Sequence, residues 1–563
     1  MEFDFEIKNK DVGGRIGLLR VNGRTAETPA LMPVYSPTKP LISTKELRKK
    51  FGAEVLMTNS YIMLKNAELK KKVLSKGVHN MLGFKGIIAT DSGSFQLMSY
   101  GNIQATNHEI IEFQNNIGSD IGSFLDIPSL PDSYKPRAEE QLNKTLARAD
   151  EALNADFLVN AGVQGAKYLD LREKAAKALG KKFNMVAVGG IVPLMEAYRF
   201  SELVDIIATV KKNIPSDRIV HAFGLGHPMI FSLAVALGVD LFDSAAYALY
   251  AKADRYITAE GTRRLSELEH ISCLCPVCNK FGLELKELDD ERRVKAIAEH
   301  NLYVTFSEIK RIKQAIREGS LWELLLMRVR AHPRVFESLD TMLKHNRWLS
   351  TLDPITKDRA FYVTGPESRK RTEVVNAKAR LKYVSSDDLV ELPAFGKVPA
   401  ALLELHPFST LAESSTADDL SKFKAILEYQ FRAEADTVLP KKIKLKRSKT
   451  SGRLRYAYHG KEMIAAVRAK DGFIIPKGSL LKSLHDNSNF PNLRVVVEDD
   501  AVPFIKEGKS VFAKFVTAVD KNLRAGDEVL IVDRDDNLIR AGTLTLAPQE
   551  ALDFNRGVAV RIR

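Results

Sequence analysis

The sequence contains few cysteines and no long apolar run. Only three cysteines occur in 563 residues, and they lie at positions 273, 275 and 278. So small, odd and clustered a set argues against a disulfide-stabilised secreted protein and favours metal binding. No apolar run approaches the roughly 20 residues that a membrane-spanning helix needs, and the amino terminus, MEFDFEIKNK, lacks a signal peptide's apolar core. We therefore expect a cytoplasmic protein without a membrane partner.

Acidic residues are absent from one stretch, KKIKLKRSKTSGRLR at 441–455, which contains eight basic residues. The net charge of the whole chain, +13, is moderate for its length and does not alone indicate a polyanionic partner. Lysine-rich edges also discourage aggregation, so an ordinary solvated strand is the alternative interpretation. The alternation in KIKLKR indicates a strand with one basic face, which suits a phosphate backbone.

Strand-like apolar segments alternate with helix-like segments through the first 250 residues. The predicted strands are 30–34, 54–58, 86–90, 122–126, 157–163, 185–190, 218–224 and 240–244. Between them, stretches such as KPRAEEQLNKTLARADEALNA carry apolar residues at three-to-four spacing. This order predicts an α/β fold, a TIM (β/α)8 barrel, with a doubly wound open sheet as the competing architecture. A leading hairpin over FEIKNKDVGGRIGLLRVNG is expected to close the bottom of the barrel.

The chain is too long for a single hydrophobic core, and the alternating pattern stops near residue 350. We predict a catalytic barrel over 1–350 with a metal-binding insertion at about 270–302. Two small domains should follow, an α+β domain over 351–420 and a basic, RNA-facing domain over 421–485. The remaining residues, 486–563, show short strands separated by turn signals, which predicts a small β-barrel.

Polar residues stand where several predicted strands end. Asp91 follows the third strand, Asp126 ends the fourth, Gln164 follows the fifth, Gly190 ends the sixth and Asp243 lies in the eighth. Each could serve only as a turn or cap residue. In a TIM barrel, however, the carboxyl ends of the strands meet at one face, where active sites are found. We therefore expect three carboxylates and an amide to converge there.

Paired aspartates suit a substitution at the anomeric carbon of a sugar. One carboxylate attacks to form a glycosyl ester, while the other transfers the proton of the leaving group. A further aspartate beside a glutamine suits recognition of a heterocyclic base, because carboxylates accept from ring N–H and amino groups. Phe95, four residues after Asp91, could stack on such a base or simply pack in the core.

The three cysteines are followed by a histidine at a spacing typical of zinc sites. Cys273, Cys275 and Cys278 with His300 would form a closed tetrahedral Cys3His site, which indicates a structural Zn²⁺ ion rather than a catalytic one. His270, three residues before Cys273, is an alternative fourth ligand. A buried thiol cluster without metal is the remaining interpretation.

Taken together, these motifs resemble those of the tRNA-guanine transglycosylase family, the base-exchange enzymes of queuosine and archaeosine synthesis. The resemblance rests on DSGSFQ, LDIP, GVQG, VGGIV, FDSAAY and CLCPVC with a later histidine, and it covers about residues 1–345. The tail, with GKSVFAKFV, GDEVLIVD and RGVAVRIR, resembles a PUA domain, a small RNA-binding barrel. A carboxyl-terminal extension of this kind is similar to that of the archaeal type.

The resemblance implies a role for each candidate residue. Asp243 matches the nucleophile that attacks C1′ of the target ribose, and Asp91 matches the residue that handles the proton, although the reverse assignment has also been made. The positions that match base contacts are Asp126, Gln164, Gly190, Phe95 and Ser92. The family's zinc ligands fall on Cys273, Cys275, Cys278 and His300, which favours His300 over His270.

For the archaeal type, the resemblance implies a tRNA partner, whose guanine 15 in the D-arm is exchanged for 7-cyano-7-deazaguanine. It also implies one structural Zn²⁺ ion and a homodimer. Two alternatives stay open: a queuosine-type enzyme that acts on the wobble guanine of the anticodon, and a non-catalytic tRNA-binding subunit. A small-molecule barrel enzyme such as an aldolase or a glycosidase would not explain an RNA-binding tail.

Overall fold

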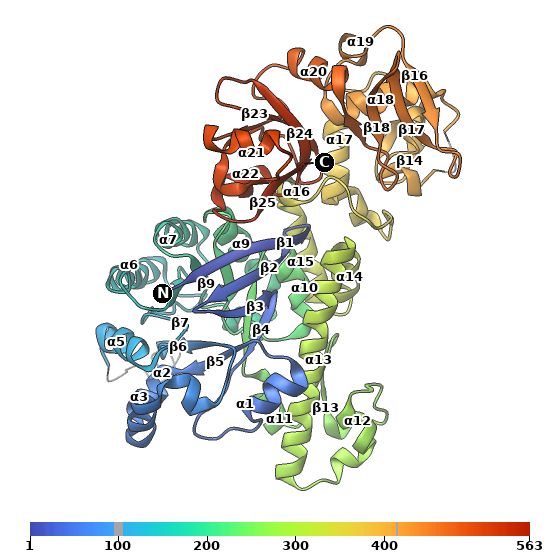
Figure 1. The fold of residues 1–563 in the computed structure, drawn as a ribbon. Helices are drawn as coiled ribbons and strands as arrows, with labels where there is room; N and C mark the ends of the chain where they lie inside the picture. The colour runs from blue at the N-terminus through green and yellow to red at the C-terminus, as the bar shows by residue number, and fades with distance from the viewer. Residues whose placement is uncertain (95–104, 413–414, 563) are drawn as a thin grey trace. The chain divides into compact units, whose positions relative to one another are not determined.

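The protein divides into two compact units, residues 1–342 and 343–563 (Figure 1). A computed structural model of the 563-residue chain describes residues 1–94, 105–412 and 415–562. Within these ranges, none of the helices has both the length and the apolar composition needed to cross a lipid bilayer.

An eight-stranded parallel sheet forms the centre of the first unit. Its strands are β4 (Ala30–Pro33), β5 (Val55–Asn59), β6 (Ile87–Asp91), β7 (Ile121–Gly122), β8 (Leu158–Val163), β9 (Met185–Val188), β10 (Ile219–Ala222) and β11 (Leu241–Ser244). They are almost entirely buried, as expected of parallel strands covered by helices. Neighbouring strands pair in chain order, and β11 returns to pair with β4. A parallel bridge between Val34 and Met57 joins β4 to β5, so the ring is nearly closed. The predicted TIM barrel is confirmed.

Helices follow the strands and surround them (Figure 1). They include α3 (Ala67–Leu82), α5 (Asn107–Ile117), α6 (Lys135–Glu151), α7 (Leu169–Lys182), α9 (Phe200–Lys212), α10 (Pro228–Ala236) and α11 (Ala246–Lys252). Local sequence sets their ends: α5 begins at a capping box between Thr106 and Glu109 and ends at Gly118, whose φ is 73°.

A three-stranded antiparallel sheet precedes the barrel: β1 (Phe3–Asp11), β2 (Gly14–Val21) and β3 (Arg24–Thr28). Arg15 forms a buried ion pair with Asp240, directly before β11, at an Nε–Oδ1 distance of 2.8 Å. Arg24 forms a second ion pair with Asp120, directly before β7, at an Nη1–Oδ1 distance of 3.1 Å. Both acids precede their strands, so this sheet covers the amino ends of the barrel, as predicted from the leading hairpin.

The fourth barrel strand is shorter than predicted, because β7 ends at Gly122 and residues 123–126 are not strand. Two side chains of α5 take the place of a neighbouring strand. The amide of Ser123 donates to Gln114 Oε1 at 3.0 Å, and the amide of Leu125 donates to Asn107 Oδ1 at 2.8 Å. Asp126 therefore lies four residues beyond β7, not at its end.

After β11 and α11, the chain inserts a hairpin and a short helix before a long helix. These elements are β12 (Arg255–Thr258), β13 (Gly261–Arg264), α12 (Pro276–Phe281) and α13 (Asp290–Glu318). The long helix α13 packs against α11, β12, α12 and β1. Helices α14 (Leu321–Val329) and α15 (Pro333–Lys344) follow it.

The second unit contains a four-stranded antiparallel sheet that carries the basic segment. Its strands, in order from one edge, are β16 (Lys444–Arg447), β17 (Leu454–His459), β18 (Glu462–Val467) and β19 (Ile474–Pro476). Helix α18 (Asp419–Phe431) contributes Tyr429, which lies between the rings of Phe408 and Phe473. Residues on both sides of position 420 therefore share one aromatic core.

A six-stranded sheet forms the carboxyl-terminal part of this unit. It contains β20 (Arg494–Val497), β21 (Val511–Phe512), β22 (Val516–Val519), β23 (Glu528–Val532), β24 (Leu538–Leu544) and β25 (Val558–Ile562). Strand β20 pairs in parallel with β23, and the other pairs are antiparallel.

Candidate active site

Three aspartates meet at the carboxyl end of the barrel. Asp91 is the last residue of β6, Asp243 lies in β11, and Asp126 follows β7. They are close enough that the negative charges of Asp126 and Asp243 both raise the pKa of Asp91. The structure thus brings together three carboxylates that are separated by as many as 152 positions in the sequence (243 − 91).

The pKa of Asp91 is raised from its ordinary 3.8 to about 7. Burial of the carboxyl group is the largest cause, followed by the charges of Asp126 and Asp243, while the backbone amides of Ser92 and Gly93 act in the opposite direction. Asn59 Nδ2 donates to Asp91 Oδ2 at 3.1 Å. A carboxyl group with a pKa near neutrality can both give and accept a proton, which is what acid–base catalysis requires.

This raised pKa makes the stability of the native state depend on pH. Between the unfolded pKa of 3.8 and the folded pKa of about 7, the native protein holds the Asp91 proton and the unfolded chain does not. The native state therefore loses stability as pH rises through this range, by about 4 kcal/mol in total. We expect Asp91→Asn to melt several degrees above the unsubstituted protein at pH 8, with a smaller difference at pH 5. An equal difference at both pH values would contradict the assignment.

Asp126 and Gln164 form a hydrogen-bonded pair. Gln164 Nε2 donates to Asp126 Oδ2 at 2.6 Å, and both side chains are buried. Burial raises the pKa of Asp126, while hydrogen bonds from Ser94 and Gln164 oppose the rise. Glycines make room for the pair: a Cβ at Gly162 would lie 2.4 Å from Asp126 Oδ2, and one at Gly189 would lie 2.2 Å from Gln164 Nε2.

Gly190 follows β9 with a φ of 67°, a conformation that favours glycine. A Cβ there would lie 3.1 Å from Gln164 Oε1 and 3.0 Å from the carbonyl oxygen of Ser129. Gly190 therefore lies beside the Asp126–Gln164 pair, at a position where a side chain would crowd it.

Two hydrogen bonds hold one oxygen of the Asp243 carboxylate. His221 Nε2 lies 2.9 Å from Asp243 Oδ1, and the Gly224 amide donates to the same oxygen at 2.6 Å. His221 is fully buried and comes from β10, the strand next to β11. Both bonds reach Oδ1, so they fix the carboxylate without covering its second oxygen.

Two further candidate residues lie in the DSGSFQ motif. Ser92 is buried and its Oγ lies 3.0 Å from Ser94 Oγ; Ser94 in turn donates to Asp126. The side chain of Ser92 is therefore connected to Asp126 through Ser94. Phe95 lies outside the described residues.

Sequence reasoning missed three buried polar residues around the site, Asn160, Arg172 and His221. Arg172 donates to the carbonyl oxygens of Val163, Ala166 and Gly189, and so connects the ends of β8 and β9. Asn160 lies inside a predicted strand that is otherwise apolar, and His221 lies inside one whose other polar residue is Arg218 at its start. A polar residue in a fully buried strand needs a hydrogen-bond partner. The polar character of these two positions is therefore the feature of the sequence that could have identified them.

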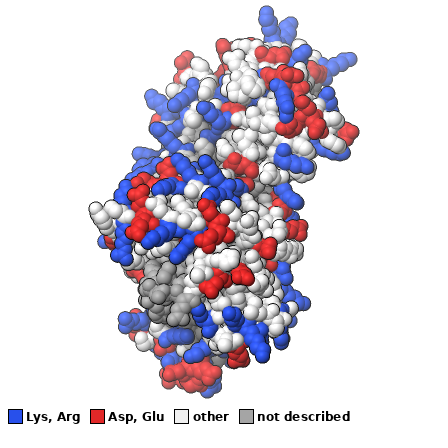
Figure 2. Space-filling model, turned by 90° about the vertical axis from the view of Figure 1, so that its left-hand side faces the viewer, with Lys and Arg blue, Asp and Glu red and all other residues white. Residues whose placement is uncertain are grey.

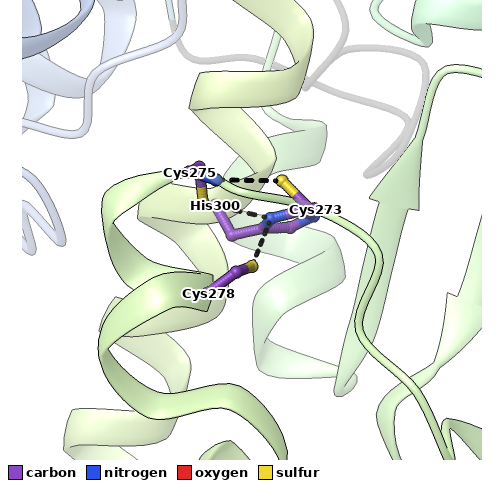
Figure 3. Close-up of side chains that lie close together, drawn as sticks. All are labelled: Cys273, Cys275, Cys278 and His300. Carbon is purple, nitrogen blue, oxygen red and sulfur yellow. Dashed lines mark hydrogen bonds between the residues drawn. The ribbon is translucent and has the colours of Figure 1, made fainter.

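A separate cluster of three cysteines and one histidine lies in the insertion after the barrel (Figure 3). The ligand atoms of Cys273, Cys275, Cys278 and His300 all lie within 4.8 Å of one another. Cys278 comes from α12 and His300 from α13, and the four side chains point toward one another. The exposed His270 is not part of this cluster.

The donor set fits a metal ion. His300 Nε2 donates to the carbonyl oxygen of Ile257 at 2.9 Å, which leaves the lone pair of Nδ1 directed at the thiols. That Nδ1 lies 3.2 Å from Cys278 Sγ and 3.6 Å from Cys275 Sγ. Tyr256 stacks on the imidazole with ring centroids 3.5 Å apart and fixes its plane. The cluster could therefore hold a metal ion in a closed site.

Comparisons with known families cover most of the chain. Residues 10–334 match the family described as queuine tRNA-ribosyltransferase. Residues 421–491 match the patch-forming domain C2 of tRNA-guanine transglycosylase, and residues 493–563 match the PUA domain.

Curated relatives match over the full length. The chain is 46% identical to the tRNA-guanine(15) transglycosylase of Pyrococcus abyssi, with 99% of this chain and 97% of the relative aligned. It is 45% identical to the enzyme of that name from Thermococcus onnurineus, over 100% and 99% of the two chains. It is also 41% identical to the one from Methanocaldococcus jannaschii, over 99% of both. The chain therefore belongs to the tRNA-guanine transglycosylase family, in its archaeal form with a carboxyl-terminal PUA domain.

Proposed function

We propose that this transferase exchanges guanine 15 in the D-arm of tRNA for 7-cyano-7-deazaguanine. The observation that carries the proposal is the convergence of Asp91, Asp126 and Asp243, with an Asp91 pKa of about 7, at the carboxyl end of the barrel. The relatives named for position 15 align with the whole chain, which favours this target over the anticodon. A non-catalytic subunit would have no need of paired carboxylates in different environments.

The first step is an attack by Asp243 on C1′ of the target ribose. A bond forms between the carboxylate oxygen and C1′, while the bond between C1′ and N9 of guanine breaks. Protonated Asp91 delivers its proton to the departing base. Its pKa of about 7 leaves a large protonated fraction at neutral pH, where an ordinary aspartate would have almost none.

The second step reverses these events with the incoming base. Ionised Asp91 accepts the proton from N9 of 7-cyano-7-deazaguanine, the new C1′–N9 bond forms, and the ester to Asp243 breaks. Guanine and its deaza analogue share the pyrimidine-ring edge. Asp126 accepts from ring N–H and amino groups of that edge, and Gln164 and the backbone at Gly190 complete the recognition.

The tRNA partner supplies phosphates as well as the base. Lysine and arginine side chains are interspersed with acidic ones on the face drawn in Figure 2, so this face is not uniformly basic. We propose that the basic segment at 441–455 and the PUA domain bind the tRNA backbone. We further propose a homodimer, as the family resemblance implies, which light scattering would test.

A base-exchange assay tests the proposed function. The protein is incubated with radiolabelled guanine and unmodified tRNA, and the labelled nucleotide is located by nuclease digestion. We expect label at position 15 and its displacement by 7-cyano-7-deazaguanine. Label at the wobble position would show the queuosine type, and no label with an intact, tRNA-binding protein would support the non-catalytic alternative.

We propose that the metal in the Cys3His cluster is a structural Zn²⁺ ion, since three thiolates and one imidazole leave no open position. Purified protein should contain one zinc per chain. Cys278→Ser should lose the zinc and melt at a lower temperature, because metal binding stabilises the fold of the insertion. His270→Asn is the matched control and should keep one zinc. Full metal content in Cys278→Ser would exclude this site.

A further inference from the structure

We infer that Asn160 and His221 are positioning residues that present one oxygen of Asp243 for attack. This inference rests on the proposed function, because it concerns the same nucleophile. Asn160 Nδ2 lies 3.0 Å from His221 Nδ1, and His221 Nε2 lies 2.9 Å from Asp243 Oδ1. The three residues come from three strands, β8, β10 and β11. Asn160 is 1% exposed and His221 is 0% exposed, so water does not replace these bonds.

For a neutral imidazole at position 221, hydrogen-bond chemistry fixes the order of donors and acceptors from Asn160 through His221 to Asp243. Asp243 Oδ1 already accepts from the Gly224 amide at 2.6 Å, as an ionised carboxylate oxygen does. A neutral imidazole that faces the same oxygen must carry its proton on Nε2. Its Nδ1 is then an acceptor, and the amide nitrogen of Asn160 is the donor that satisfies it. Asn160 thereby selects the tautomer that His221 needs.

The arrangement treats the two oxygens of Asp243 differently. Oδ1 receives both donors, from His221 and from Gly224. Among the described residues, no hydrogen bond reaches Oδ2. A lone pair on Oδ2 therefore remains for bond formation with C1′, while Oδ1 holds the rotation of the carboxyl group. Such pre-orientation raises the rate of attack without contact between His221 and the substrate.

Substitutions at His221 separate positioning from bulk packing. His221→Leu removes both nitrogen atoms, and we expect kcat for guanine exchange to fall about 100-fold with KM for tRNA within about twofold. Gln can place its amide nitrogen near the position of Nε2. The kcat of His221→Gln should therefore be about tenfold higher than that of His221→Leu. A purely structural role predicts similar kcat values for Leu and Gln variants of equal melting temperature.

Substitutions at Asn160 test the tautomer. Asn160→Asp has the same shape but, when ionised, can only accept. At a pH where the imidazole is neutral, it therefore favours a proton on Nδ1 and turns the lone pair of Nε2 toward Asp243. Asn160→Leu only removes the donor. We expect Asn160→Asp to form covalent tRNA adduct more slowly than Asn160→Leu, by about tenfold. Equal adduct rates for the two variants, or unchanged rates in both, would overturn the inference.

A matched control lies at the opposite end of the barrel. His79 Nε2 lies 2.8 Å from Oδ2 of Asp120, an acid that precedes β7. His79→Leu breaks a comparable pair away from the chemistry, and its kcat should stay within about twofold of the unsubstituted protein. If the unsubstituted protein exchanges guanine and His221→Leu does so at the same rate, the positioning role is wrong and the proposed function stands. If the unsubstituted protein exchanges no guanine, the proposed function itself fails.

Discussion

Asp243→Asn is expected to lose base exchange by at least about 10⁴-fold, because an amide cannot attack C1′. In the unsubstituted protein, His221 Nε2 and the Gly224 amide lie 2.9 and 2.6 Å from Asp243 Oδ1. The amide oxygen of the variant can still accept from both. The variant should therefore fold and bind tRNA with an affinity within about twofold of normal. Single-turnover exchange and a denaturing gel for the covalent tRNA–protein adduct measure the two effects.

Asp91→Asn is the matched comparison for this experiment. It removes the group whose pKa is about 7, so departure of guanine loses its acid catalyst and exchange should slow by about 10²- to 10⁴-fold. The nucleophile is intact, so a slow covalent adduct should still accumulate. An adduct in Asp243→Asn and none in Asp91→Asn would reverse the two roles.

The second large effect is expected at the basic edge strand β16 and the residues before it. Four of the lysines here are exposed and can reach a phosphate backbone: Lys441, Lys442, Lys444 and Lys446. Replacing all four by alanine should weaken tRNA binding on the order of 100-fold and lower the slope of log affinity against log salt by roughly three. Filter binding at several salt concentrations measures both quantities, and kcat at saturating tRNA should change little.

The control for this variant removes the same charge from the barrel. Four exposed lysines on α7 serve this purpose: Lys174, Lys177, Lys181 and Lys182. Their replacement by alanine should leave the salt slope within about one of the normal value. Equal slopes for the two fourfold variants would show that the basic segment binds no phosphates. The alternative of an ordinary solvated edge would then be correct.

The periodicity of the sequence was enough to predict the barrel, because alternating strand and helix signals are local. The bounds of β6 and β11 differ from the predicted 86–90 and 240–244 by one residue at most. The strand predicted at 122–126 was wrong beyond Gly122, because Ser123 and Leu125 bond to side chains of Gln114 and Asn107. A local pattern cannot show that a side chain elsewhere satisfies a backbone amide.

The same limit applies to the site. Asp91 and Asp243 were identifiable because they stand at strand ends, where a TIM barrel places its chemistry. Asn160 and His221 could not be assigned to the site in this way, since their partners are set by the neighbouring strands and not by spacing along the chain. The fourth metal ligand was also ambiguous from spacing. The family resemblance favoured His300, and the structure confirms that His300 is buried within the cysteine cluster while His270 is exposed outside it.

Identification of the residue that carries the ribose tests the central proposal most directly. The unsubstituted protein is mixed with tRNA in the absence of a free base, quenched in acid and digested with nuclease and protease. Mass spectrometry should then find the ribosyl mass on the peptide that contains Asp243. A ribosyl mass on the Asp91 peptide, or guanine exchange without modification of any aspartate, would contradict this account.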